Sequence, residues 1–288
     1  MYDFNIVNVL RPSDWITIVY LAITGVLACI FHKNLRWWGI YVVSHTGAIC
    51  GLLWLAFIPE DSLPLALQVL RDWYPISTIL IFYLEIPPLA QMVLQGYLDD
   101  KVIEWEGRLF NGQPSMYFSA RFPSRWLSEL LHLCYFSYYP IVFGLVTLLY
   151  FQGRHEAFHE VVFGEVLTFN LCLIWYIFMP VMGPYYNFEK IRGPVTDGFF
   201  FKLVHMILSS AASKGTAFPS SHCAIGVIVV LYAAHYHPVA FAILCPFGIG
   251  LVVATVYARM HYALDAIAGT IFAGVVFGVA PYLYRLLQ

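Results

Sequence analysis

The chain has 288 residues, of which 60% are hydrophobic and 11% are charged, with a formal net charge of -2. A soluble domain carries about 45–50% apolar and about 25% charged residues, so this composition excludes a soluble globule. The near-neutral charge supplies no basic surface, and nucleic acid is not expected as a partner. The sequence therefore predicts an all-helical domain embedded in a lipid bilayer.

Long uncharged stretches predict the membrane-spanning helices, at roughly 20 residues for each crossing. The candidate stretches are residues 15–31, 37–58, 74–94, 130–151, 161–182, 220–236, 239–257 and 262–284. The third contains Glu85 and the pair Pro87-Pro88, so it is predicted to kink, to break or to re-enter the membrane. We expect a polytopic bundle of about eight transmembrane helices.

The predicted helices form one membrane domain over residues 1–288. It divides into an N-terminal helix pair, residues 1–72, and a core of about six helices, residues 73–288. The N-terminus has mixed charges and no small-residue cleavage site after its first apolar stretch, so we do not expect a removable signal peptide. The six cysteines are scattered singly and are interpreted as small apolar residues.

Two long connections, residues 95–129 and 183–219, mix aromatic and charged residues in the manner of helices that lie at the membrane interface. The span count places both connections, and the short loop near residue 257, on the same side of the membrane. The second connection carries four cations, of which Lys190, Arg192 and Lys214 are candidates for binding a phosphate. Each of them is able to bind a phosphate or to anchor the chain at the interface, and spacing alone leaves both readings open.

The second connection ends in Phe218-Pro219-Ser220-Ser221-His222, directly before an apolar stretch. The start of a helix presents unpaired N–H groups and the positive end of the helix dipole, which favours a phosphate oxygen. Ser220 and Ser221 add hydroxyl donors, and His222 adds a titratable proton. The alternative is a plain helix cap with a histidine at the interface.

The last predicted span is preceded by Tyr257-Ala258-Arg259-Met260-His261-Tyr262-Ala263-Leu264-Asp265. His261 and Asp265 are four residues apart and share a helix face, so the carboxylate can orient the imidazole and leave its other nitrogen basic. An aspartate inside a membrane helix is costly without such a partner. The alternative is a structural pair that seals the helix end.

The two histidine motifs together resemble the type 2 phosphatidic acid phosphatase superfamily of lipid phosphatases and phosphotransferases. The matching residues are Pro219, Ser220 and His222 in one motif and His261 and Asp265 in the other. The resemblance implies that His261, oriented by Asp265, attacks phosphorus while His222 protonates the leaving alcohol. It also implies that neither a metal nor another cofactor is required.

Some positions depart from the usual pattern of that superfamily. Ser221 stands where many members have glycine, and Thr255 stands where they commonly have an arginine. The nearby arginine is Arg259, and this variant, like the segments 183–186 and 106–114, resembles the branch that contains inositol phosphorylceramide synthase. The resemblance makes Ser220, Ser221, Arg259, Lys190, Arg192 and Lys214 the candidate phosphate-binding residues.

Arg259 and His261 lie about 200° apart around a regular helix, so they cannot both face one phosphate from it. An irregular turn over about residues 257–261 is therefore predicted, with the last span beginning near His261.

The side of the membrane is left open by the charges. Four of the 15 Lys and Arg residues fall on the N-terminal side and eleven on the side of the site, but five of those eleven belong to the candidate site loops. The resemblance favours the outer face, which in a bacterium is the periplasmic face of the inner membrane.

Three functions remain as hypotheses. The first is a phosphatase that hydrolyses a lipid phosphate or diphosphate, and the second is a phosphotransferase that uses the same histidines with an alcohol acceptor. Both take a membrane lipid phosphate as substrate. The third is a proton-coupled transporter, in which the intramembrane acids Glu85 and Glu165 join Asp265 in a proton path. The sequence does not indicate the oligomeric state.

Overall fold

The computed structural model describes residues 9–211 and 213–288, and residues 1–8, where the retained N-terminus was expected to begin, lie outside this range. Within the described residues all regular secondary structure is helical, and the one strand-like feature is an isolated bridge between Val181 and Thr216. The long helices are α1 (Pro12–Ile30), α2 (Trp38–Ala56), α3 (Leu65–Leu89), α6 (Arg125–Phe136), α7 (Tyr138–Phe151), α8 (His155–Phe178), α11 (Ser221–Tyr236), α12 (Pro238–Tyr257) and α13 (Ala263–Leu286). The predicted fold class, a polytopic helical membrane bundle, is confirmed.

All eight predicted stretches are helical, but they differ in how well they suit a membrane crossing. Five described helices, α1, α2, α8, α12 and α13, are long and apolar enough to cross, and α6 with α7 makes a sixth span bent by 43°. Helix α11 has only 16 residues. Helix α3 is long, but Asp72, Glu85 and three internal prolines lower its hydropathy.

The predicted break at Pro87-Pro88 does not occur there, because α3 continues through both prolines to Leu89. Because proline has no N–H, positions 87 and 88 cannot donate to the carbonyls of Tyr83 and Leu84, and only one residue of the helix follows them. The helix nevertheless ends directly after them, so the stretch predicted to reach residue 94 stops five residues earlier.

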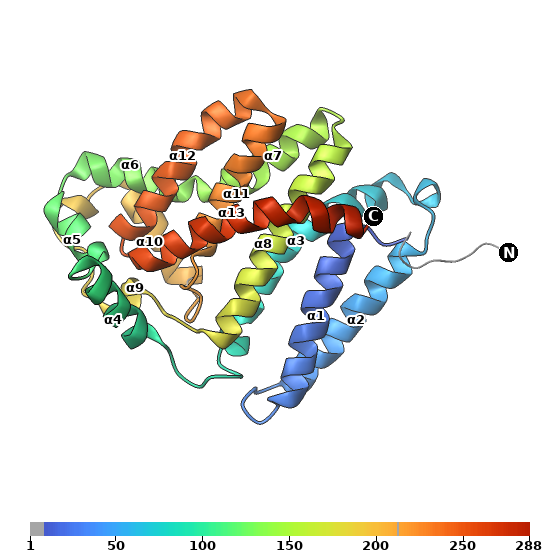
Figure 1. The fold of residues 1–288 in the computed structure, drawn as a ribbon, viewed down its shortest axis with the longest axis horizontal. Coiled ribbons are helices and arrows are strands. Elements are labelled where there is room, and N and C mark those ends of the chain that lie inside the picture. The colour runs from blue at the N-terminus through green and yellow to red at the C-terminus, as the bar shows by residue number, and fades with distance from the viewer. Residues whose placement is uncertain (1–8, 212) are drawn as a thin grey trace.

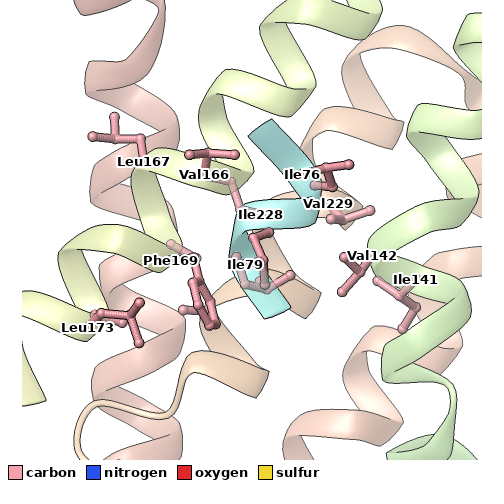
Figure 2. Close-up of a cluster of buried hydrophobic side chains, with 14 of the residues drawn as sticks. Ile76, Ile79, Ile141, Val142, Val166, Leu167, Phe169, Leu173, Ile228 and Val229 are labelled. Atoms are coloured by element: carbon pink, nitrogen blue, oxygen red, sulfur yellow. The ribbon is translucent and has the colours of Figure 1, made fainter. Parts of the chain in front are cut away.

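Helix α8 lies at the centre of the bundle and packs against α1, α3, α7, α11 and α13. Its apolar side chains meet those of three neighbours in the core that Figure 2 shows. The labelled residues are Ile76 and Ile79 of α3, Ile141 and Val142 of α7, Val166, Leu167, Phe169 and Leu173 of α8, and Ile228 and Val229 of α11. The core therefore joins the N-terminal half of the chain to the helix that carries His222.

The two long connections form short helices, as predicted. These are α4 (Asp99–Phe110), α5 (Pro114–Arg121), α9 (Pro184–Asn187), the 3-10 turn η3 (Pro194–Thr196) and α10 (Phe199–Ala211), with a further 3-10 turn, η2 (Glu60–Ser62), before α3. In Figure 1, α4, α5, α9 and α10 gather at the end of the molecule opposite the α1–α2 pair. This end carries the heads of α11 and α13.

Candidate active site

The two histidines of the sequence motifs come together in the structure. His222 lies in the first turn of α11, and His261 lies in the loop between α12 and α13. Their ring centroids are 5.6 Å apart. The predicted meeting of the two imidazoles is therefore confirmed, and an atom between the rings would be within reach of both.

His222 is positioned by the start of its helix. Ser220 is the N-cap residue, and its Oγ accepts a hydrogen bond of 3.3 Å from the backbone N–H of Cys223. The hydroxyl of Tyr176, on the central helix α8, accepts from the N–H of Ser221 and donates to the carbonyl of Pro219. These bonds satisfy groups that a helix start leaves unpaired, and they hold the motif against the core.

Close packing against α13 brings this helix start to His261. A Cβ atom added to Gly269 of α13 would lie 2.3 Å from the carbonyl oxygen of Ser220. No real side chain tolerates that distance to backbone, so only glycine permits this approach of α13 to the head of α11.

His261 is positioned by a turn and not by a helix. Helix α12 ends at Tyr257, Arg259 has a positive φ of 58°, and the N–H groups of Met260 and His261 both point to the carbonyl of Thr255. Helix α13 begins only at Ala263. The predicted irregular turn is confirmed, with the helix starting two residues after the histidine.

The hydrogen bond at Nδ1 decides the tautomer of His261. Nδ1 lies 3.0 Å from the carbonyl oxygen of Ala217, which can only accept, so Nδ1 carries the proton and Nε2 carries the lone pair. Asp265 was expected to be this partner. Its Oδ2 lies 3.5 Å from Nδ1 and accepts a shorter bond of 2.8 Å from the N–H of Tyr262, so the orienting role is shared with a carbonyl.

Burial lowers the pKa of His261 to about 4, against the opposing effect of the hydrogen bond to Ala217. The ring is 5% exposed. His261 is therefore neutral at neutral pH, and its Nε2 is available as a nucleophile or a base.

His222 has a different environment. Its Nε2 lies 3.4 Å from the hydroxyl of Tyr135, its ring packs against that of Tyr138, and its buried Nδ1 has no hydrogen-bond partner within the described residues. A buried ring nitrogen without a partner is a group that a substrate oxygen can satisfy.

A small cavity of about 50 Å³ opens between the two histidines, and its walls include Tyr83, Tyr186 and Ser221. A larger groove of about 230 Å³ continues from it between α3, α7 and α10. The groove shares five lining residues with the cavity: Tyr83, Tyr135, Leu208, Ser221 and His222. Its other walls are almost wholly apolar, so an apolar channel ends at the histidine pair.

The expected phosphate-binding cations lie around this cavity and do not line it. The Nζ of Lys190 lies 3.0 Å from the ring centroid of Tyr185, and that of Lys214 lies 5.3 Å from the ring centroid of Tyr186. Both tyrosines line the cavity, so the two lysines lie at its rim. Arg192 is exposed on the loop before η3.

Arg259 points into the interfacial segments. Its Nε donates to the Oγ of Ser119 at 3.1 Å, and its guanidinium donates to the carbonyl of Glu189 at 2.7 Å. Neither Arg259 nor Ser220 lines the cavity, whereas Ser221 lines both the cavity and the apolar groove. The described residues also contain no cluster of three or more His, Cys, Asp or Glu side chains that could hold a metal ion.

The intramembrane acids of the transporter hypothesis do not line this cavity either. Glu85 accepts hydrogen bonds from Tyr20 and pairs with His45 at 3.2 Å, between α1, α2 and α3. Glu165 is fully buried in α8, and neither of its oxygens has a hydrogen-bond partner within the described residues.

Sequence reasoning missed Asp99, a buried residue at the start of α4. Its carboxylate accepts from the N–H groups of Met182 and Gly183 at 2.8 and 2.9 Å and from the hydroxyl of Tyr262 at 3.0 Å. Asp99 is thus bonded on one side to Tyr262, the residue that follows His261. On its other side it is bonded to the segment that follows Val181. The carbonyl of Val181 accepts a 2.9 Å bond from the N–H of Ala217, and Ala217 is the partner of His261. The available signal was its spacing from Val102 and Glu106, a stripe on one face of a helix.

The sequence comparisons agree with this geometry. A family model described as the PAP2 superfamily matches residues 101–279, which is more than half of the chain and includes both histidine motifs. No curated protein and no solved structure matches the chain significantly. On the extent of the family match, the chain belongs to the PAP2 superfamily.

Proposed function

We propose that the protein is a membrane-embedded lipid phosphate phosphatase that works through a phosphohistidine intermediate. The observation that carries the proposal is the pair of imidazoles 5.6 Å apart at the end of an apolar groove. A substrate with a phosphate at the end of a hydrocarbon chain fits both spaces, since the chain is favoured in the groove and the phosphate in the cavity.

In the first step, the Nε2 lone pair of His261 attacks phosphorus, and the bond from phosphorus to the lipid oxygen breaks. The leaving oxygen takes a proton from His222, which starts this step as the imidazolium, acts as general acid and is left as neutral imidazole. The phosphorylated ring of His261 gains a positive charge, which Asp265 at 3.5 Å and the carbonyl of Ala217 stabilise.

In the second step, water attacks the phosphorus of the phosphohistidine and gives a proton to His222. The bond from phosphorus to Nε2 breaks, phosphate leaves, and both histidines return to their starting protonation states. The scheme uses no metal, because the hydroxyl of Ser221, the head of α11 and the lysines at the rim supply the positive potential for the phosphate oxygens.

The second candidate is a phosphotransferase, in which an alcohol replaces water in the second step. The segments 106–114 and 183–186 support it, because they resemble the branch that contains inositol phosphorylceramide synthase. The two candidates share the first step and differ only in what resolves the intermediate.

The test is phosphate release by the detergent-purified chain, in the presence of a chelator, from dioleoyl phosphatidic acid, farnesyl diphosphate and phosphatidylglycerol phosphate. We expect release by the native chain, and a loss of at least about a thousandfold in both His261→Ala and His222→Ala. Added myo-inositol should leave phosphate release unchanged for a phosphatase and divert it to phosphoinositol for a transferase. Turnover that the chelator abolishes, or that persists in His261→Ala, would reject the mechanism.

We also propose that the site faces away from the cytoplasm. Arg108 is exposed on α4, at the same end as the site, so Arg108→Cys in a variant lacking Cys29 and Cys50 should react with an impermeant maleimide from outside intact cells. Reaction only after the cells are opened would place the site in the cytoplasm.

A further inference from the structure

Glu106, on α4, is a buried acid near the site that the proposed mechanism leaves without a role. Its side chain is 0% exposed. Oε1 accepts a hydrogen bond of 3.1 Å from the N–H of Leu264, but the buried Oε2 has no hydrogen-bond partner within the described residues. A buried carboxylate with an unpaired oxygen is costly in its charged form, so this oxygen calls for an explanation.

A second unpaired oxygen belongs to Asp265, in the same helix turn. The Oδ2 of Asp265 accepts from the N–H of Tyr262, whereas its buried Oδ1 has no partner. The first turn of α13 is therefore held by two carboxylates, Asp265 from the helix itself and Glu106 from α4. One buried oxygen of each has no hydrogen-bond partner within the described residues, and two buried carboxylates that feel each other's charge are costly if both are ionised.

The charges around Glu106 favour its protonated form. The titratable side chain that acts on Glu106 is Asp265 on α13, while Asp99, earlier on α4, is bonded to the hydroxyl of Tyr262. Burial, opposed by the hydrogen bond from Leu264 and assisted by the negative charge of Asp265, raises the pKa of Glu106 to about 7. Within the described part of the chain, no Lys or Arg forms an ion pair with either carboxylate.

We propose that Glu106 is a positioning residue of the active site, which stays protonated on Oε2 and so adds no second negative charge to that of Asp265 behind His261. The inference rests on the proposed role of His261 in phosphoryl transfer. One negative charge balances the one positive charge of the phosphorylated ring. A second, on ionised Glu106, would repel the anionic substrate and push apart the two acids that hold the head of α13.

The first test compares the native chain with Glu106→Gln, whose amide keeps an oxygen for Leu264 and stands in for the uncharged, protonated carboxyl group. The probe is phosphate release from dioleoyl phosphatidic acid. We expect the kcat of the native chain, divided by that of Glu106→Gln, to fall about tenfold between about pH 6 and about pH 8, as for one required proton with a pKa near 7. Taking the ratio of the two kcat values cancels the titration of the substrate, because it affects both enzymes equally. Glu106→Ala should be impaired at every pH.

The second test needs no substrate. Because the folded state holds the proton more tightly than the unfolded state, the stability that the proton contributes is complete below about pH 4.5 and is lost as the pH rises through about 7. The thermal midpoint of the native chain should therefore fall over this range relative to that of Glu106→Gln. The matched control is Glu104→Gln, an exposed acid on the same helix, whose midpoint should follow the native curve.

The two tests separate the possible failures. Parallel midpoint curves for the native chain and Glu106→Gln would show that Glu106 holds no proton and would overturn the inference, whatever the activity. A midpoint that responds as expected, together with a kcat ratio that does not change with pH, would overturn the positioning role. A native chain that releases no phosphate from any lipid would reject the proposed function, and this inference with it, even if the midpoint responds.

Discussion

The two halves of the candidate site are built in different ways. His222 belongs to a helix and is placed mainly by packing, because α11 approaches α13 closely at Gly269, with added hydrogen bonds between the head of α11 and Tyr176 of the central helix. His261 lies outside any helix and is placed by polar contacts, with the carbonyl of Ala217 in the second connection and with Asp265 in the first turn of α13. A packed half resists small polar changes but not added volume, whereas a hydrogen-bonded half has the opposite sensitivity.

The largest effect is expected from Gly269→Val, which disrupts the packing that positions His222. The new side chain would meet the backbone of Ser220, so α11 and α13 must separate. We expect a loss of about 3 kcal/mol in the free energy of unfolding or more, and at least about a hundredfold loss of phosphate release. Thermal unfolding and the phosphate assay measure the two effects.

Gly274→Ala is the matched control on the same helix, because a Cβ at Gly274 has no neighbour within 4 Å. It should be neutral or slightly stabilising. If Gly269→Val kept native activity, the close approach of the two helices would not be what brings the histidines together.

The next largest effect is expected from Asp99→Ala, which removes hydrogen bonds that support the position of His261. The change leaves the N–H groups of Met182 and Gly183 and the hydroxyl of Tyr262 without their acceptor, at a cost of about 1–3 kcal/mol for each buried group left unpaired. The position of His261 should loosen, and kcat should fall by about tenfold to a hundredfold.

The control for this prediction is Asp100→Ala, an exposed neighbour on α4, which should behave like the native chain. A variant Asp99→Ala that lost stability but kept its full kcat would show that the polar contacts support the fold without placing His261.

A smaller effect is expected from Tyr135→Phe, which tests the environment of His222. The hydroxyl lies 3.4 Å from Nε2, a long hydrogen bond, and its removal leaves the packing of the two rings in place. We expect kcat to fall by about threefold to tenfold with an unchanged KM, measured by phosphate release. Tyr282→Phe, at an exposed ring on α13, is the control. An effect on KM alone would assign the hydroxyl to substrate binding.

The smallest effect is expected from Lys190→Ala and Lys214→Ala, since both lysines lie at the rim of the cavity. Each should raise KM by about twofold to fivefold and leave kcat unchanged, and the effect should shrink as salt is added. Lys101→Ala, on the exposed face of α4, should leave KM unchanged. A large fall in kcat in either variant would place that lysine on the reacting phosphate and contradict the positions described above.

The bundle and the histidine pair could be predicted from the sequence because each depends on short-range signals. Apolar stretches of the length of a bilayer mark the helices, and the two motifs stand at the heads of such stretches. The turn at Arg259 was also predictable, because a regular helix separates Arg259 from His261. The continuation of α3 through Pro87 and Pro88 was not predictable, because the helix keeps its course there although both residues lack the N–H that would donate to the preceding turn.

Only the tertiary structure decided which groups surround His261. Asp99 and Glu106 of α4, and Ala217 of the second connection, are all far from His261 in the chain. No local sequence pattern reveals which carbonyl or carboxylate a distant segment will place near this loop. The same holds for Gly269, whose need for glycine comes from the backbone of another helix. Hydrophobic length is a property of one segment, whereas hydrogen-bond partners and close contacts are properties of pairs of segments, and these exist only once the chain has folded.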